Sequence, residues 1–120
     1  METNKKLSEH FTRKEFECPC CGQAEIDPEL IALLEKIRAS LGGKVVVTSG
    51  YRCRKHNRKV GGAEGSYHCR GMAADIKVEG AAPERVAKCA ESILGGGGGV
   101  GRYGSWTHVD SRVAKARWRG

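Results

Sequence analysis

The most chemically informative part of the sequence is a ten-residue segment that contains one imidazole and one carboxylate. In Ser66-Tyr67-His68-Cys69-Arg70-Gly71-Met72-Ala73-Ala74-Asp75, His68 ends a loop and Asp75 falls within a predicted strand. Gly71 permits a tight turn between them, because glycine adopts backbone conformations that are closed to other residues. An imidazole and a carboxylate are two of the three protein ligands that a catalytic zinc ion usually takes.

A third ligand has to come from another segment, and His108 is the strongest candidate. Along Trp106–Arg112 the alternation of a strand places His108, Asp110 and Arg112 on one face and Val109 on the other. A face of His, Asp and Arg makes a poor buried surface but a suitable wall for an active site. Spacing alone leaves two interpretations open: metal ligands, or structural histidines held by hydrogen bonds.

Four motifs in the same order resemble the zinc D-alanyl-D-alanine carboxypeptidases and related peptidoglycan endopeptidases. The motifs are Leu7-Ser8-Glu9-His10-Phe11 with the cysteine-rich turn after it, Ser49-Gly50-Tyr51-Arg52, Ser66-x-His68-x-x-Gly71-x-Ala73-x-Asp75, and His108-Val109-Asp110. The first is similar to small phage and prophage members of the group. The D-Ala-D-Ala dipeptidases and the metal-binding fold of hedgehog signalling domains are similar as well. The likeness covers the chain from about Leu7 to Arg112.

The resemblance implies one Zn²⁺ held by His68, Asp75 and His108, and hydrolysis of peptide bonds in the stem peptides or crosslinks of bacterial peptidoglycan. It also implies that Arg52 binds substrate and stabilises the developing oxyanion. An ordinary surface cation is the alternative for Arg52. Ser66 is expected to hydrogen-bond the substrate or to orient its own loop.

One position departs from the family pattern. Many relatives carry Glu or Asp three residues before the last metal-binding His as a general base, and here that position is Ser105. Asp110 is the remaining carboxylate on the His108 face, so we predict it as the general base. The alternative is that Asp110 orients His108 through its second ring nitrogen. Ser105 also supports an alternative for the whole protein, a non-catalytic zinc-binding module of the same fold that binds cell wall.

A small set of elements must position these residues. Thr12 and Glu15 form a capping box, with Phe11 and Phe16 placed as a hydrophobic staple, so a short helix is predicted from Thr12. Asp27 starts a second helix as N-cap, before a proline at the first helical position. The apolar face of this helix consists of Leu30, Ile31, Leu34, Ile37 and Leu41, and a glycine pair is predicted to end the helix.

The rest of the chain divides into short segments. Strands are predicted over 44–48 and 72–78, a third helix over 83–94, and a hairpin from 100–103 and 106–112. The stretch 49–66 is predicted to be irregular, the glycines of 95–99 a mobile connection, and 115–120 a basic tail. Helices mixed with antiparallel strands predict an α+β fold, a small antiparallel sheet with flanking helices, in a single zinc peptidase domain of residues 1–120.

Composition narrows the partners. The chain has 21 Lys and Arg against 14 Asp and Glu, a net charge of +7, which favours anionic partners such as a bacterial envelope. The basic residues are scattered and no aromatic platform accompanies them, so nucleic acid is not predicted as a partner. We expect a monomer that acts on a peptidoglycan peptide.

No segment indicates a membrane span or a leader. No run approaches the roughly 20 apolar residues of a transmembrane helix, and the first ten residues lack the run of about 7–15 apolar residues of a signal peptide. Synthesis in the cytoplasm and action on the cell wall after release are therefore expected, as for a phage or prophage lysis enzyme.

Six cysteines are many for such a chain: Cys18, Cys20, Cys21, Cys53, Cys69 and Cys89. An even number indicates disulfides, whereas the missing export signal favours reduced thiols or a metal. The first three are predicted to be too tightly spaced for the usual CxxC zinc knuckle, and no matching second pair is visible. Cys53 and Cys69 are expected to lie close enough to brace the site.

Overall fold

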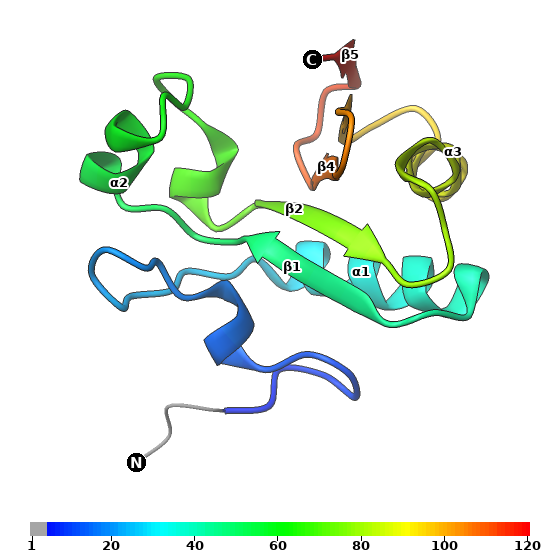
Figure 1. Cartoon of the computed structure of the whole chain (residues 1–120), viewed down its shortest axis with the longest axis horizontal. Helices are drawn as coiled ribbons and strands as arrows, with labels where there is room; N and C mark the ends of the chain where they lie inside the picture. Colours follow the sequence, from blue (N-terminus) through cyan, green and yellow to red (C-terminus); the bar gives the residue numbers. More distant parts are fainter. Residues whose placement is uncertain (1–4) are drawn as a thin grey trace.

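The fold is built on one five-stranded sheet, which a computed structural model describes within residues 5–120 (Figure 1). The strand order is β1-β2-β4-β3-β5, and every neighbouring pair is antiparallel except β3 and β5, which are parallel. The strands are β1 (Val45–Ser49), β2 (Ala73–Val78), β3 (Gly99–Arg102), β4 (Thr107–Asp110) and β5 (Ala116–Arg119). The predicted α+β fold with a mainly antiparallel sheet is confirmed.

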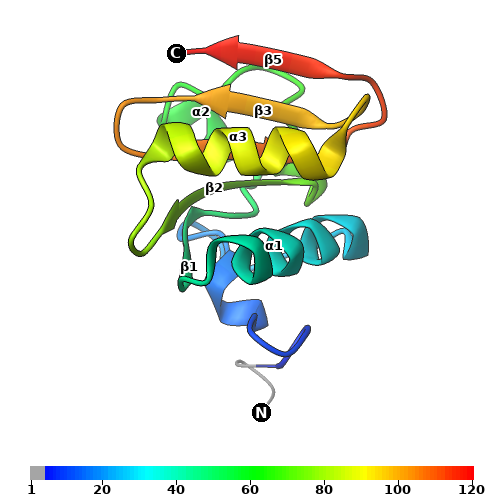
Figure 2. The same cartoon turned by 90° about the vertical axis from the view of Figure 1, so that its right-hand side faces the viewer.

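Two longer helices cover one face of the sheet. Figure 2 shows α1 (Pro28–Leu41) and α3 (Pro83–Leu94) side by side in front of the strands. The side chain of Asp27 caps α1 by accepting a hydrogen bond from the backbone N–H of Glu29 at 3.3 Å, and Gly42 ends the helix in the left-handed conformation. Both ends of α1 therefore form as the sequence predicts.

Shorter helices lie toward the other end of the molecule. They are η1 (Arg13–Phe16), α2 (Arg54–Lys59) and η2 (Tyr67–Arg70), of which η1 and η2 are 3₁₀ helices. The capping box of Thr12 and Glu15 is present, and the rings of Phe11 and Phe16 lie 6.1 Å apart between centroids. The predicted N-terminal start is thus confirmed.

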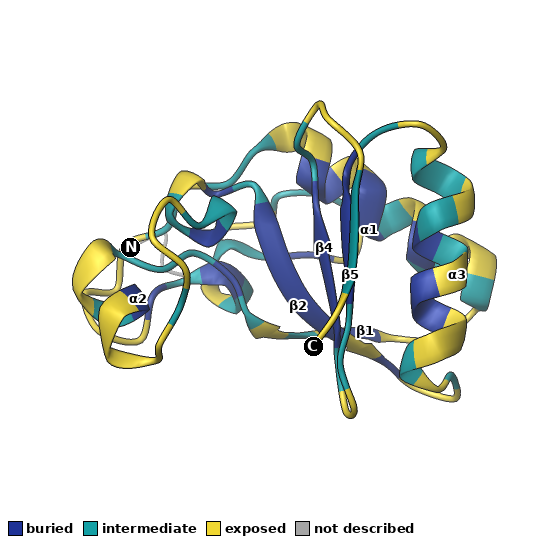
Figure 3. Cartoon of the chain, turned by 90° about the horizontal axis from the view of Figure 1, so that it is seen from above, coloured by how far each residue is buried: buried dark blue, intermediate teal, exposed yellow. Residues whose placement is uncertain are grey.

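The hydrophobic core lies between the sheet and the helix pair α1 and α3. Ile76 of β2, Val100 of β3 and Val109 of β4 are fully buried and belong to one core cluster with residues of both helices, among them Leu34 and Ile37 of α1 and Val86 and Ala90 of α3. Strand β4 is buried along its length and β2 is buried except at Lys77, while α3 is buried only on the side that faces the sheet (Figure 3). Because side chains alternate along a strand, the residues between these core positions face away from the helices. The opposite face of the sheet therefore carries Asp75, His108 and Asp110.

Three segments differ from their sequence predictions. The stretch 49–66, predicted as irregular, contains α2. The run 95–99, predicted as a mobile connection, ends in two buried glycines, and the second of them begins β3. The predicted basic tail is instead β5, which pairs with β3 from Ala116 to Arg119. In each case tertiary contacts order residues whose local sequence has weak propensity.

Among the described residues, none of the helices has the length and apolar character needed to cross a membrane.

Gly71 provides a first testable prediction, because it adopts φ +71° and a Cβ there would lie 2.2 Å from the carbonyl oxygen of Glu25. Gly71→Ala is expected to lower the free energy of unfolding by roughly 2–5 kcal/mol, from left-handed strain and overpacking together. Gly65→Ala is the matched control, since φ is +76° and nothing lies within 4 Å. It should cost only the backbone strain of roughly 1–2 kcal/mol. Urea unfolding of both variants checks the difference, and equal losses would contradict the role of the Glu25 contact.

Candidate active site

Three side chains predicted as metal ligands converge on the face of the sheet away from α1 and α3. His68 comes from η2, Asp75 from β2 and His108 from β4, and their ligand atoms all lie within 4.8 Å of one another. Asp75 Oδ1 lies 3.2 Å from His68 Nε2 and 3.1 Å from His108 Nδ1. Asp75 and His108 are direct partners in the antiparallel pairing of β2 with β4. All three are buried, so the chain orders them before any ligand binds.

In each imidazole, the ring nitrogen that faces away from Asp75 also has a hydrogen-bond partner. His68 Nδ1 lies 2.8 Å from the carbonyl oxygen of Gly50, and because a carbonyl only accepts, Nδ1 is the protonated nitrogen. His68 Nε2 therefore presents a lone pair toward Asp75. His108 Nε2 lies 2.8 Å from Asp110 Oδ2, which leaves His108 Nδ1 facing the same point. Metal-binding histidines are usually held in this way, so two imidazoles and a carboxylate fit a divalent metal ion.

The electrostatics of the cluster suit a cation. Burial raises the pKa of Asp75, but its close contacts with His108 and His68 outweigh burial and hold that pKa well below its usual range. Burial lowers the pKa of His108, and the neighbouring carboxylates of Asp110 and Asp75 more than offset this, so its pKa lies above the ordinary value. Asp75 is thus ionised at neutral pH, as a metal ligand must be.

Asp110 lies on the far side of the His108 ring from Asp75, and it is fully buried. Its Oδ2 accepts a hydrogen bond from Arg112 at 2.7 Å in addition to its contact with His108. Its Oδ1 accepts from Nε and the backbone N–H of Arg112 at 2.8 and 3.1 Å. Both oxygens are therefore occupied by neighbours. This geometry differs from the predicted general base and favours the alternative, in which Asp110 orients His108.

An aromatic wall that the sequence analysis missed stands beside His108. Trp118 of β5 lies 4.9 Å from the His108 ring between centroids, and the Arg112 guanidinium lies over the rings of Tyr67 and Trp118 at 4.2 and 5.3 Å. A signal was available in the sequence, since Ala116 to Arg119 alternates small or aromatic residues with arginines. That alternation is typical of a strand, whereas the basic composition of 115–120 favours a tail.

Two glycines of β3 allow this wall to lie close to the sheet. A Cβ at Gly101 would lie 2.5 Å from the Trp118 ring, and one at Gly99 would lie 2.2 Å from Asp110 Oδ2. The glycine run predicted to be mobile thus ends at Gly99, a position that must lack a side chain. Without these two glycines, Asp110 and Trp118 would be displaced from His108.

Arg52 and Ser66, the predicted substrate-binding residues, border the cluster. Arg52 follows β1 and donates to Asp75 Oδ2 at 3.3 Å, to Ser49 at 3.1 Å and to Asn57 at 3.2 Å. It therefore contacts the carboxylate at the centre of the site, which a loose surface cation would not. Ser66 caps η2 by accepting from the backbone N–H of His68 at 3.1 Å. Of the two predicted roles of Ser66, this hydrogen bond supports the orientation of its own loop.

Ser105 occupies the position at which relatives were expected to carry an acid. It is exposed in the turn between β3 and β4, next to Lys77 and Pro83, and it lines a small cavity on the far end of β2. It does not lie beside His68 or Asp75. The residue type at this position therefore does not decide between a catalytic and a non-catalytic protein.

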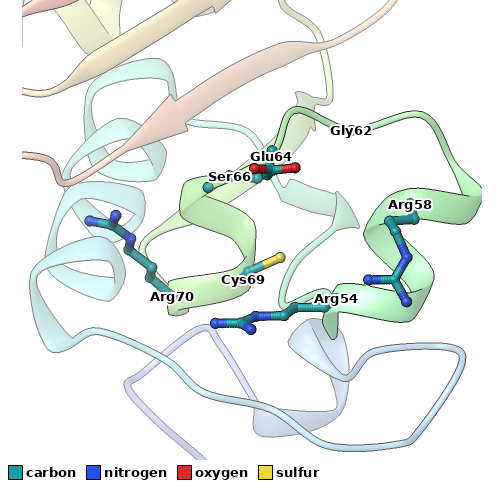
Figure 4. A pocket seen from close by; sticks show the side chains of 8 residues that line it. Arg54, Arg58, Gly62, Glu64, Ser66, Cys69 and Arg70 are labelled. Carbon is teal, nitrogen blue, oxygen red and sulfur yellow. The ribbon is translucent and has the colours of Figure 1, made fainter.

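A basic pocket of about 580 Å³ opens between α2 and η2. Figure 4 shows Arg54 and Arg58 projecting from α2, with Arg70 on the η2 side and Glu64 and Ser66 along the loop between them. The metal-facing side chains do not line this pocket, although Ser66 and Arg70 flank His68 in sequence. The guanidinium groups of Arg54 and Arg58 beside this hollow favour an anionic group such as a carboxylate.

Comparison with known proteins agrees with this geometry. Residues 9–110 match the model of a family described as Peptidase M15. The peptidoglycan L,D-endopeptidase MepK of Escherichia coli K12 is 34% identical over 97 residues, which cover 75% of this chain and 53% of MepK. A probable peptidoglycan L,D-endopeptidase MepK of Haemophilus influenzae is 31% identical over 104 residues, 80% of this chain and 55% of that protein. The chain thus spans about half the length of these relatives.

The matched residues include η2, β2 and β4, from which the buried His–Asp–His cluster is built. On this match and this geometry, the chain belongs to the M15 family of peptidases.

Proposed function

We propose that this protein is a zinc-dependent peptidase that hydrolyses peptide bonds of bacterial peptidoglycan, as an endopeptidase that cuts within crosslinks or stem peptides. The observation that carries the proposal is the buried cluster of His68, Asp75 and His108, with the far nitrogen of each imidazole anchored. The family membership supports peptide hydrolysis. The names of the MepK relatives support the substrate and favour an endopeptidase over a carboxypeptidase.

Zinc fits this set of ligands, because catalytic zinc takes His and carboxylate ligands and keeps one position open. A bound zinc ion would supply the Lewis acidity that activates water and a peptide carbonyl. The residues of the chain do the positioning. Asp75 remains ionised between the two imidazoles. Asp110 holds His108 so that Nδ1 faces the metal position, and Gly50 does the same for His68 Nε2.

Arg52 is the residue that we propose to bind substrate at the reacting carbonyl. Its guanidinium touches Asp75, so it lies at the edge of the metal position, and it is only partly buried. A fixed cation there stabilises negative charge that develops on the carbonyl oxygen. The arginines of the basic pocket offer a second contact, for the free carboxylates that peptidoglycan stem peptides carry.

Replacing Arg52 tests this role. Arg52→Ala is expected to lower kcat by about 10²–10³-fold, the range for losing one oxyanion-stabilising group, while zinc content remains that of the wild type. Steady-state kinetics on a soluble crosslinked muropeptide, with zinc measured on the same samples, provide the check. Arg58→Ala, in the basic pocket, is the control, and it should raise KM more than it lowers kcat. Loss of zinc in Arg52→Ala would instead assign Arg52 to holding Asp75 in place.

The whole proposal is tested by digesting purified peptidoglycan with and without a chelator. Chelator-sensitive release of fragments is expected, and their masses identify the bond that is cut. No release from a protein that holds zinc in its His–Asp–His site would overturn the proposal and favour the non-catalytic wall-binding module. The monomeric state, the single domain over 1–120 and action on the wall after release, as in phage lysis, stay predictions.

A further inference from the structure

A second group of metal-ligating side chains lies apart from the active site, where the segment before α1 meets the loop after β1. The sulfur atoms of Cys18, Cys21 and Cys53 all lie within 4.8 Å of one another, and those of Cys18 and Cys53 are 3.7 Å apart. Cys18 and Cys21 have CxxC spacing and lie together with Cys53, contrary to the prediction that this turn is too tightly spaced for a zinc knuckle. Cys18 is the neighbour of Cys53 in this cluster, and the proximity of Cys53 to Cys69 stays a prediction.

The turn Cys18-Pro19-Cys20-Cys21-Gly22 directs backbone N–H groups at the first sulfur. Cys18 Sγ accepts a hydrogen bond from the backbone N–H of Cys53 at 3.5 Å, and the backbone amides of Cys20 and Cys21 lie near the same sulfur. The turn is closed by the N–H of Gly22, which donates to the carbonyl of Cys18 at 2.8 Å. N–H groups aimed at sulfur stabilise a thiolate.

The second segment of the cluster, around Cys53, also directs a backbone N–H group at a sulfur. Cys53 Sγ accepts a hydrogen bond from the backbone N–H of His56 at 3.4 Å, so the N-terminus of α2 also points at a sulfur. The spacing Cys53-x-x-His56 mirrors Cys18-x-x-Cys21. Lys55 adds a positive charge beside Cys20. Two short turns, from segments 35 residues apart in sequence, thus bring three sulfurs together among donors and a cation.

We propose that Cys18, Cys21 and Cys53 bind a structural zinc ion, separate from the catalytic one. Thiolates are the preferred ligands of structural zinc, and paired CxxC or CxxH turns that bring four ligands together are the usual arrangement. A Cys18–Cys53 disulfide would bring the sulfurs to about 2.05 Å and leave Cys21 without a partner. Two candidates for the fourth ligand are Cys20 and His56, which neighbour the cluster in sequence and line one cavity together with Pro19, Lys55 and Lys59.

Such an ion would join the N-terminal segment to the loop that carries Arg52. The two segments already touch, since the N–H of Tyr51 donates to the carbonyl of Phe16 at 2.9 Å. Cys53 directly follows Arg52, whose guanidinium contacts Asp75. A zinc ion bound by the three cysteines would therefore hold the backbone at Arg52 in place, without contacting His68 or His108.

The test is metal analysis of the purified full-length chain, prepared under reducing conditions, by mass spectrometry. About two zinc ions per chain are expected, because each site takes one. Cys53→Ser and Cys18→Ser should each lose one and lower the melting temperature. Cys89→Ser, a half-buried cysteine on α3, is the matched control and should keep both. His108→Ala should lose the other ion, which separates failure of this inference from failure of the proposed function.

Cobalt substitution keeps the test valid even where a cysteine variant does not fold. Cobalt bound to the wild-type protein should show the intense thiolate charge-transfer absorption in the near ultraviolet, and His108→Ala should retain it, because the active site contains no sulfur. If His56→Ala loses the zinc ion and Cys20→Ser keeps it, His56 is the fourth ligand. The reverse result would make Cys20 the fourth ligand. One zinc per chain with no thiolate absorption, or a Cys18–Cys53 disulfide in peptide maps of the reduced preparation, would overturn the proposal.

Discussion

Replacing either His68 or His108 with alanine is expected to abolish both zinc binding at the active site and hydrolysis of peptidoglycan. Each imidazole supplies one of three ligand atoms that lie within 4.8 Å of one another. With only two ligands left, the site falls below the three that a catalytic zinc ion normally requires. The loss of affinity should exceed the roughly 10–100-fold that follows removal of a group behind a ligand.

The measurement is zinc titration by calorimetry together with fragment release from peptidoglycan. His10→Ala is the matched control, because His10 pairs with Glu35 of α1 at 2.7 Å and, among the described residues, has no hydrogen bond or ion pair with His68, Asp75 or His108. It should retain both zinc and activity. Activity that survives in His68→Ala at saturating zinc would remove His68 from the catalytic site. Unfolding curves recorded in a chelator separate lost binding from a lost fold.

Asp110→Asn is expected to weaken zinc binding by about 10–100-fold, and added zinc should restore most of the hydrolysis. The reason is that Asp110 acts on His108 rather than on substrate, with both of its oxygens held by His108 and Arg112. The asparagine has nearly the same shape, but it has lost the charge that stabilises the imidazole facing it. The variant therefore retains a weakened site.

A general base gives the opposite pattern. Zinc affinity would stay that of the wild type, and kcat would fall by about 10²–10⁴-fold at any zinc concentration. Measuring kcat across a zinc titration distinguishes the two roles in one experiment. Failure of added zinc to restore turnover in a fully loaded variant would show that our assignment of Asp110 is wrong.

The local sequence was sufficient for the elements that carry strong local signals. The capping box at Thr12, the Asp27 cap and the apolar spacing of α1 all form as predicted, because capping and helical periodicity act over a few residues. The resemblance of the motifs to a known family likewise grouped His68, Asp75 and His108. Gly71 and strand alternation place His68 and Asp75 locally, whereas the pairing of β2 with β4 brings His108 to them.

Tertiary structure alone decided the partners of these residues. No local pattern states that Asp110 bonds to the far nitrogen of His108, that Cys53 lies against Cys18, or that the basic segment after Lys115 becomes a strand. Each depends on contacts between distant segments. β5 forms because β3 offers a free edge and glycines against which Trp118 can pack. The sequence by itself therefore determined which side chains can carry the chemistry, and the pairing of strands and loops decided which of them touch the metal position and which act from behind it.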